Sequence, residues 1–138
     1  MNNCIKSTLF GLTLILIFCL PAKVFGQQTE IAKWESNLAE ASNDSLRFVA
    51  LTKLFSLNAR SKIDLANDYL IKAEEIAKGQ QSVYFKGVVL NQRAAYFNYK
   101  GNYDSTLAYA TKACEILEKS PYKIPYAKSL GTLSTALG

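Results

Sequence analysis

The stretch Ser61–Lys78 (SKIDLANDYLIKAEEIAK) matches the stretch Gly101–Glu118 (GNYDSTLAYATKACEILE) at a spacing of forty residues. Six positions are identical in the two stretches: Asp64 with Asp104, Tyr69 with Tyr109, Lys72 with Lys112, Ala73 with Ala113, Glu75 with Glu115 and Ile76 with Ile116. Apolar residues recur at helical spacing in both, and a fixed period of this size is typical of proteins that stack helix pairs. The repeat therefore predicts an all-α fold built as an antiparallel helix-pair solenoid.

The N-terminus has the pattern of a secretory signal peptide. Lys6 provides the positive charge, Leu9–Leu20 is a twelve-residue apolar run, and VFG at 24–26 provides a cleavage pattern. We predict cleavage directly before Gln27, so that residues 1–26 are removed and the chain is exported to the periplasm or cell envelope. An uncleaved membrane anchor is the alternative, but a spanning helix needs roughly 20 apolar residues, more than this run offers.

The charge and cysteine content of the remaining chain restrict its class. The whole sequence has 16 Lys and Arg against 11 Asp and Glu; Lys6 and Lys23 lie in the predicted signal peptide, which leaves 14 against 11 and a net charge of +3. This mild excess lacks the dense basic stripe of a nucleic-acid-binding protein, so we expect no nucleic-acid partner. Cys114 is the only cysteine after residue 26, so packing rather than a disulfide must stabilise a single domain.

The remaining chain is predicted to be helical throughout. The expected segments are a lead-in helix within 27–43 and repeats over 44–138, divided into 44–80, 84–121 and the first helix of a third pair from about 125. The expected helix caps are Asn43 or Asp44, Ser61 in a capping box with Asp64, and Asn102. The expected inward-facing residues include Leu46, Val49, Ala50, Leu54, Leu57, Ala66, Leu70, Ala73, Val83, Leu90, Ala94, Phe97, Tyr103, Leu107, Ala110, Ala113 and Leu117.

Residues 88–121, VVLNQRAAYFNYKGNYDSTLAYATKACEILEKSP, resemble a tetratricopeptide repeat, a helix-turn-helix unit of about 34 residues. The resemblance is carried by an aliphatic, a small and an aromatic position of the first helix, by the turn, and by the second-helix alanine: Leu90, Ala94, Phe97, Gly101-Asn102-Tyr103 and Ala113. Thr106 and Ala110 depart from the pattern, as does the spacing of forty residues. The longer spacing resembles the variant found in sensory portions of bacterial regulators.

The resemblance also implies a binding surface. In tetratricopeptide repeats the first helix of each pair lines a concave groove, and the corresponding residues here are Leu51, Phe55, Asn58, Asn91, Ala95, Asn98, Tyr99 and Lys128, followed by Gly131 and Thr135. Asparagine amides can hold an extended peptide backbone because they offer both donors and an acceptor. Only Lys128 fits a basic carboxylate clamp, so the resemblance favours a more apolar groove for a protein or peptide partner.

Features of an enzyme are absent from the sequence. It contains no histidine, which excludes histidine-based triads and zinc sites, and no glycine-rich phosphate loop. We therefore predict no catalytic site, no metal site and no cofactor. The carboxylates Glu74, Glu75, Glu115 and Glu118 are expected to be exposed helix charges that pair with Lys72, Lys78, Lys112 and Lys119.

Two side-chain groups allow a structural and a functional interpretation. Cys114 is expected to be a small buried hydrophobe. The alternative, a redox-sensing thiol, would require exposure and a lowered pKa. Tyr96 and Tyr99 are expected to pack between repeats, with ligand contact as the alternative.

We expect an exported interaction module of the tetratricopeptide type, serving as the extracytoplasmic sensory part of a longer regulator. A stand-alone periplasmic scaffold for envelope or secretion assemblies is the alternative. A membrane helix followed by a kinase or DNA-binding segment beyond Gly138 would favour the first. The uncharged end SLGTLSTALG predicts that the third pair is completed by a C-terminal extension or covered by another subunit. Membrane contact is expected only through the signal segment or such an extension.

Overall fold

The computed structural model describes residues 21–137, with side chains from Gly26 onward, and the predicted signal segment up to residue 20 lies outside the described residues. The described residues form six helices and no strand: α2 (Pro21–Ala39), α3 (Asp44–Asn58), α4 (Ile63–Gly79), α5 (Val83–Tyr99), α6 (Tyr103–Glu118) and α7 (Lys123–Leu137). The prediction of an all-α fold is thus confirmed for this part of the chain. The predicted cleavage point before Gln27 lies inside α2.

The chain divides into two units, Met1–Lys33 and Trp34–Gly138. Of the first unit, Pro21–Lys33 is the N-terminal part of α2, in which Ile31 is half-buried and the other described side chains are exposed. The second unit contains the end of α2 and all of α3 to α7. It therefore contains every residue that we predicted for the binding surface.

Short polar side chains begin three of the helices. The Oδ1 atoms of Asn43 and Asn102 accept hydrogen bonds from the backbone N–H groups of Leu46 and Ser105 at 2.9 and 3.0 Å, as the predicted caps require. Ser82 Oγ caps α5 in the same way. The predicted capping box at Ser61 is wrong, because Lys62 occupies the cap position of α4 without a side-chain hydrogen bond.

The turn between α5 and α6 depends on Gly101. Its φ of +72° lies in the left-handed region, where a side chain would strain the backbone. The backbone N–H of Asn102 closes the turn by donating to the carbonyl of Phe97 at 2.9 Å. The chain therefore reverses sharply here, which brings α6 back along α5.

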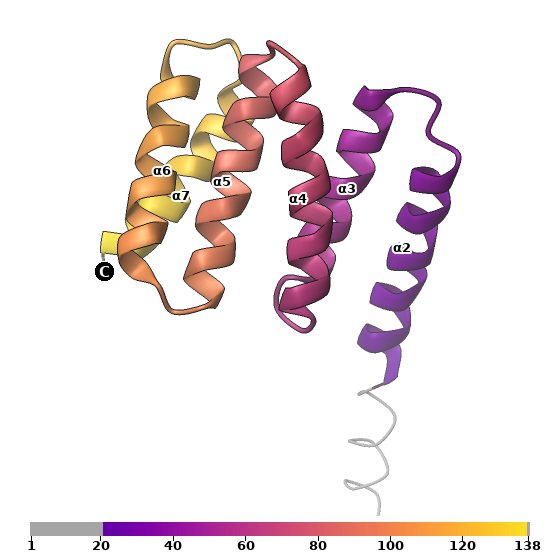
Figure 1. The fold of residues 1–138 in the computed structure, drawn as a ribbon. Coiled ribbons are helices and arrows are strands. Elements are labelled where there is room, and N and C mark those ends of the chain that lie inside the picture. Colours follow the sequence, from indigo (N-terminus) through magenta and orange to yellow (C-terminus); the bar gives the residue numbers. More distant parts are fainter. Residues whose placement is uncertain (1–20, 138) are drawn as a thin grey trace, which may run out of the picture. The chain divides into compact units, whose positions relative to one another are not determined.

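Helices α3 to α7 run alternately up and down (Figure 1). Each contacts the next one along the chain, and α5 also contacts both α3 and α7. Helices α4 and α6, by contrast, do not contact each other. Hence α3, α5 and α7 form one layer of adjoining helices, and α4 and α6 form a second layer packed on it.

Small side chains of α4 and α6 allow these helices to approach their partners closely. Ala66, Ala73, Ala110 and Ala113 all have an exposed fraction of 0%. The main hydrophobic cluster joins α4 to α3 and α5 through Phe48, Leu51, Phe55, Ala59, Ala66, Leu70, Ala73, Ala77 and Val89. The predicted inward positions of α4 are therefore correct.

Four residues predicted to face inward are exposed: Leu46 (52%), Val49 (38%), Val83 (42%) and Tyr103 (59%). On α3 the residue that packs inward is Phe48, whose ring stacks on Phe85 of α5 at a centroid distance of 4.1 Å. Apolar residues surround much of α3, so helical spacing alone cannot select the buried face. The partner helix selects it. Val83 and Tyr103 are the first residues of α5 and α6, where fewer neighbours are available to cover them.

A glycine allows the close contact between α5 and α6. Gly87 is buried, and a Cβ atom placed on it would lie 2.5 Å from the Cδ2 and Cγ atoms of Leu117. Leu117 is fully buried. Residue 87 must therefore lack a side chain for Leu117 to occupy its position.

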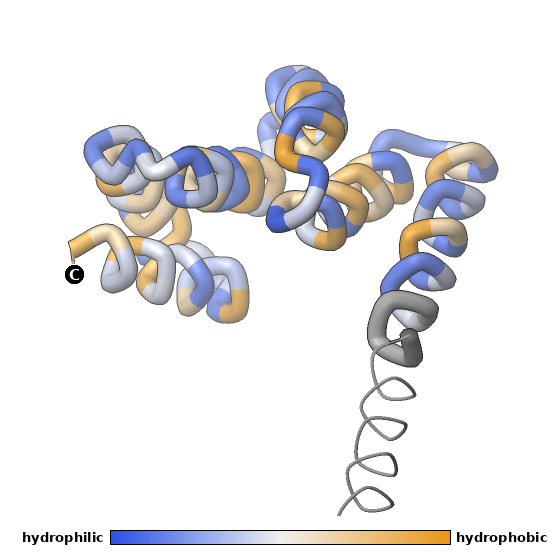
Figure 2. The backbone as a smooth tube through the Cα atoms, turned by 90° about the horizontal axis from the view of Figure 1, so that it is seen from below, coloured by the Kyte–Doolittle hydropathy of each residue, from blue (hydrophilic) through white to orange (hydrophobic). Residues whose placement is uncertain are grey.

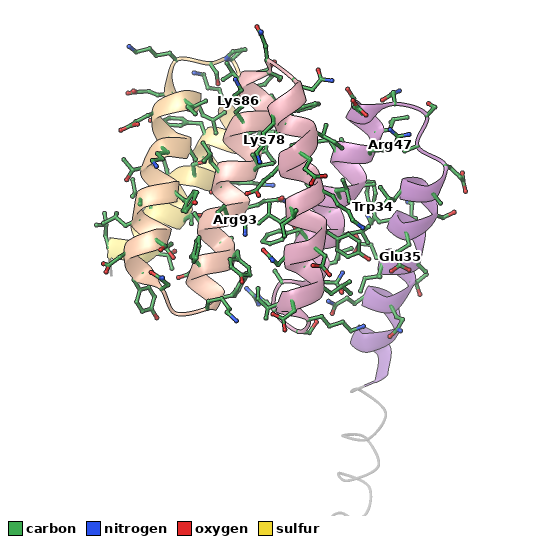
Figure 3. All side chains as sticks on the ribbon, in the orientation of Figure 1. Trp34, Glu35, Arg47, Lys78, Lys86 and Arg93 are labelled. Carbon is green, nitrogen blue, oxygen red and sulfur yellow. The ribbon has the colours of Figure 1, made fainter. Side chains whose placement is uncertain are left out.

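A half-buried ion pair joins α4 to α5. Arg93 donates from Nε and Nη2 to the two carboxylate oxygens of Glu74 at 2.8 and 2.6 Å, and from Nη1 to Asn67 Oδ1 at 2.7 Å. Figure 3 shows the Arg93 side chain beside α4. The expected pairing of Glu74 with lysines of its own helix is thus wrong. Glu75, Glu115 and Glu118 are exposed as expected, but within residues 26–137 they form no ion pair with lysines.

Hydrophobic and hydrophilic residues alternate around the helices, and none of the described helices is hydrophobic throughout (Figure 2). Among residues 21–137 no helix combines the length and the apolar character that crossing a membrane would require.

Candidate functional site

A groove of about 860 Å³ lies on the layer formed by α3, α5 and α7. Helix α3 supplies Val49, Thr52, Lys53, Phe55 and Ser56, and Ala59 directly after the helix also contributes. Helix α5 supplies Tyr84, Val88, Asn91, Gln92, Ala95 and Tyr99. The start of α7 and the turn before it supply Pro121, Tyr122, Lys123, Ile124, Pro125 and Lys128.

Helical geometry explains which side chains reach the groove. Val49, Thr52, Lys53 and Ser56 are spaced as one face of α3, and the six residues from α5 follow the same three- and four-residue steps. Since α5 lies between α3 and α7 in the layer, its residues form the floor. The residues of α3 and α7 form the two rims.

Basic side chains stand on both rims. Lys53 lies on the α3 rim, Lys123 and Lys128 lie on the α7 rim, and no Asp or Glu lines the groove. Lys53 Nζ is 5.9 Å from the ring centroid of Trp34, and Lys123 Nζ donates to the Ser120 carbonyl oxygen at 3.1 Å. Neither forms an ion pair within the described residues. The groove thus carries positive charge that no carboxylate of this part of the chain neutralises.

Two amides lie on the floor. The Thr132 hydroxyl lies 3.1 Å from both Asn91 Oδ1 and the Lys128 carbonyl oxygen, and its single proton is shared between these two acceptors. The Asn91 Nδ2 group has no acceptor in the described part of the chain. Gln92 Nε2 donates to the Thr52 carbonyl oxygen at 2.8 Å. Gln92 Oε1 is buried and meets no donor among residues 26–137. The floor therefore offers hydrogen-bond donors to a ligand at Asn91. The Gln92 side chain instead links α5 to α3 through its hydrogen bond to Thr52.

Aromatic rings mark the two ends of the floor. At the start of α5, the rings of Tyr84 and Tyr122 are 5.1 Å apart and inclined by 58°. At the other end Tyr99 is 45% exposed, and its hydroxyl accepts a hydrogen bond from Arg60 Nε at 3.5 Å. This hydrogen bond, together with the charge interaction with the same phenol, raises the pKa of Arg60.

The structure brings together part of the predicted binding set. Asn91, Ala95, Tyr99 and Lys128 line the groove. Phe55 also borders it but is only 2% exposed, because most of its side chain packs in the hydrophobic cluster. Leu51 instead belongs to the hydrophobic cluster, and Asn58 is buried with its Nδ2 donating to the Leu54 carbonyl oxygen at 2.8 Å. Asn98, Gly131 and Thr135 are not among the lining residues.

The family pattern did not indicate several lining residues, including Lys53, Tyr84, Gln92, Tyr122 and Lys123. Tyr84 and Gln92 could have been found from helical spacing, because they continue the α5 face marked by Asn91, Ala95 and Tyr99. Lys53 lies on the α3 face of Val49, Thr52 and Ser56. Tyr122 and Lys123 carry no such signal, because they belong to the turn and the first residue of α7.

Cys114 and a second hollow are two further features of the described residues that concern chemical sites. Burial raises the pKa of the Cys114 thiol, and the charges of Glu115 and Glu118 raise it further, whereas a redox-sensing thiol needs a lowered pKa. No group of His, Cys, Asp and Glu residues in this part of the chain could hold a metal ion. A second hollow of about 490 Å³ lies where the Gln81–Val83 and Lys119–Tyr122 segments meet, and it contains no cluster of reactive groups.

No protein-family model, curated protein or solved structure matches this chain.

Proposed function

We propose that this chain is an exported helical-repeat module of the tetratricopeptide type that binds an extended peptide segment of a partner protein in the groove on α3, α5 and α7. The observation that carries the proposal is a groove that crosses three adjoining helices, with an uncharged floor and polar rims. The order of the helices supports the repeat assignment, because α3 with α4 and α5 with α6 form successive pairs and α7 follows as the next first helix.

The dimensions of the groove suit a short extended peptide. Adjoining helices lie about 8–10 Å apart, so the distance from α3 across α5 to α7 is roughly 16–20 Å. An extended chain advances about 3.3 Å per residue, and about five or six residues would cross the groove. Asn91 on the floor can donate to a peptide carbonyl, while Val88 and Ala95 offer apolar contact.

A random-peptide library selected on the purified protein tests this function. Peptides that bind wild type should lose binding to Ala95→Trp, because the indole would fill the floor. They should retain binding to Ala108→Trp, which places the same ring on an exposed position of α6. Circular dichroism would show that both variants remain helical. Peptides that bind wild type and Ala95→Trp equally would contradict the groove as the binding site.

Export rests on the N-terminal pattern and has its own test. Protein recovered from the cell envelope should begin at Gln27, as measured by mass spectrometry of the N-terminal peptide. Recovery of an intact Met1 would favour the uncleaved anchor instead.

A further inference from the structure

We propose that the ligand of the groove is an acidic segment in which side-chain carboxylates meet the lysines of both rims and an apolar side chain between them rests on the floor. This inference rests on the proposed peptide-binding function and names the chemistry of the partner.

The rim lysines are the first argument. Lys53 stands on one rim, and Lys123 and Lys128 stand on the other, with no carboxylate in the lining. Within residues 26–137, Lys128 Nζ has neither a hydrogen-bond nor an ion-pair partner. By contrast, the half-buried Arg93 between α4 and α5 is matched by Glu74. What distinguishes the groove lysines is therefore that no Asp or Glu lies in the same lining, so a bound carboxylate would meet positive charge only.

The charge of the two helix layers is the second argument. Helices α3, α5 and α7 carry six basic side chains (Arg47, Lys53, Lys86, Arg93, Lys123 and Lys128) and one acidic side chain, Asp44, which pairs with Arg47 at 3.2 Å. Helices α4 and α6 carry seven acidic side chains and three basic ones, Lys72, Lys78 and Lys112. The potential therefore attracts an acidic segment to the groove layer and repels it from the other layer.

The floor is the third argument. Val88, Ala95 and the rings of Tyr84 and Tyr122 are apolar surfaces, and Asn91 offers N–H donors without a competing free acceptor. A ligand with apolar side chains and many acceptor oxygens matches this surface. Successive side chains of an extended peptide point to opposite sides, so acidic and apolar residues can face rim and floor along one segment.

The binding of two labelled peptides to the full chain tests this inference. The acidic probe is fluorescein-labelled DEFDLDED, in which Phe and Leu point to the same side of an extended chain, and its uncharged counterpart is NQFNLNQN. Affinity is measured by fluorescence anisotropy at 0.1 M salt. We expect the acidic peptide to bind at least tenfold more tightly than its amide counterpart. Equal binding of the two peptides would overturn the acidic assignment.

A matched pair of triple variants locates the effect. The groove variant combines Lys53→Gln, Lys123→Gln and Lys128→Gln, and the control variant combines Lys72→Gln, Lys78→Gln and Lys112→Gln on the other layer. Both remove three positive charges. The groove variant should bind the acidic peptide at least tenfold more weakly than wild type. The control variant should bind it with an affinity within about twofold of wild type. Equal losses in both variants would mean attraction to net charge alone and would overturn the inference.

Two further measurements identify a different occupant. Tighter binding of an eight-nucleotide oligo-dT than of the acidic peptide would replace the peptide with nucleic acid. Self-association that the groove variant abolishes and the control variant retains, measured by sedimentation, would make a second copy the occupant. If library peptides bind the groove but are neutral, the peptide-binding function stands and the acidic inference fails. If no peptide responds to Ala95→Trp, both fail.

Discussion

Helices α4 and α6 have six identical residues at the forty-residue spacing, yet they fill their interiors differently. Both bury an alanine completely at the shared position, Ala73 and Ala113. In α4 the large buried residue is Leu70 and the small one seven residues later is Ala77. In α6 the order is reversed, with Ala110 followed by Leu117, and all four have an exposed fraction of at most 3%.

The exchange of large and small residues has its cause in the partner helix. Leu117 occupies the space left by Gly87 on α5. The caps of α3 and α5, Asn43 and Ser82, are 39 residues apart, so the counterpart of Gly87 on α3 is Phe48, a large buried residue. The first helix of the first pair therefore has no glycine at the position where Gly87 makes room for Leu117. The repeat thus specifies that each pair buries one large side chain at the pair interface, while the partner helix decides where along the helix it lies.

The two helices also differ at a half-buried polar position. Glu74 on α4 binds Arg93 of the next helix, and its equivalent on α6 is Cys114. Leu133 of α7 is the residue forty positions after Arg93. One junction between successive pairs is therefore fastened by an ion pair, whereas the equivalent positions at the next junction hold a thiol and a leucine.

Removing either large side chain should have the greatest effect. Leu70→Ala and Leu117→Ala should each lower the free energy of unfolding by about 2–5 kcal/mol, because each leaves a cavity in a fully buried site. Urea denaturation followed by circular dichroism measures this. Ile116→Ala, at a position 36% exposed, is the matched control and should cost about 1 kcal/mol or less. A Leu117→Ala cost no larger than this control would contradict the packing of α6.

Enlarging the shared alanine should destabilise both helix pairs. Ala73→Leu and Ala113→Leu should each cost about 1–3 kcal/mol, because the added carbons overpack a completely buried position. Ala108→Leu, on the exposed side of α6, should leave the melting temperature nearly unchanged. If Ala113→Leu left the stability unchanged while Ala73→Leu lowered it, the two helix pairs would not be equivalent.

Adding one methyl group at Gly87 tests the close contact that distinguishes the pair α5 and α6 from the pair α3 and α4. Gly87→Ala should cost about 1–2 kcal/mol, because overlap with Leu117 outweighs the better helix propensity of alanine. Gly131→Ala is the control: its Cβ meets nothing within 4 Å, and it should stabilise the protein by about 0.5–1 kcal/mol. In a Leu117→Ala background the cost of Gly87→Ala should disappear. Additive effects of the two substitutions would show that the contact is not decisive.

Breaking the ion pair between α4 and α5 should have a smaller effect. Arg93→Met should cost about 1 kcal/mol, since the pair is partly exposed and the methionine retains apolar packing. A double-mutant cycle with Glu74→Met should show coupling of similar size. Arg47→Met, which removes the more exposed pair with Asp44 (50% side-chain exposure on both partners), should change stability by less than about 0.5 kcal/mol. Zero coupling would make the Glu74–Arg93 contact energetically neutral.

The last and smallest expected effect concerns the chemical reactivity of the Cys114 thiol and not the stability of the fold. Because burial raises the pKa of its thiol, less thiolate is present at neutral pH than for an ordinary cysteine, whose pKa is about 8.5. Iodoacetamide should therefore modify Cys114 more slowly at pH 7 than a model cysteine peptide, and its rate should rise at higher pH than the rate of the peptide. A rate profile shifted to lower pH would support a redox-sensing thiol instead.

Spacing along the sequence predicted much of the fold but only part of the groove. The helix ends at Asn43 and Asn102 were correct, because caps depend on residues within one turn. Leu51 and Asn58 were expected to line the groove but are buried. The family positions did not show which face of α3 is buried, because that face depends on contacts between helices such as the stacking of Phe48 on Phe85. Lys123 was missed because it borders the same groove as Lys53, on the opposite rim, only after three helices have packed together.

The sequence by itself determined that this chain is helical, where most helices begin and end, and which small residues permit close packing. These properties arise from interactions between residues within one or two turns of each other. Only the tertiary structure decided that Leu117 rests on Gly87, that Arg93 binds Glu74, and that lysines of α3 and α7 border one groove. These contacts join residues far apart in the chain, and the identity of each partner follows from packing that no local pattern encodes.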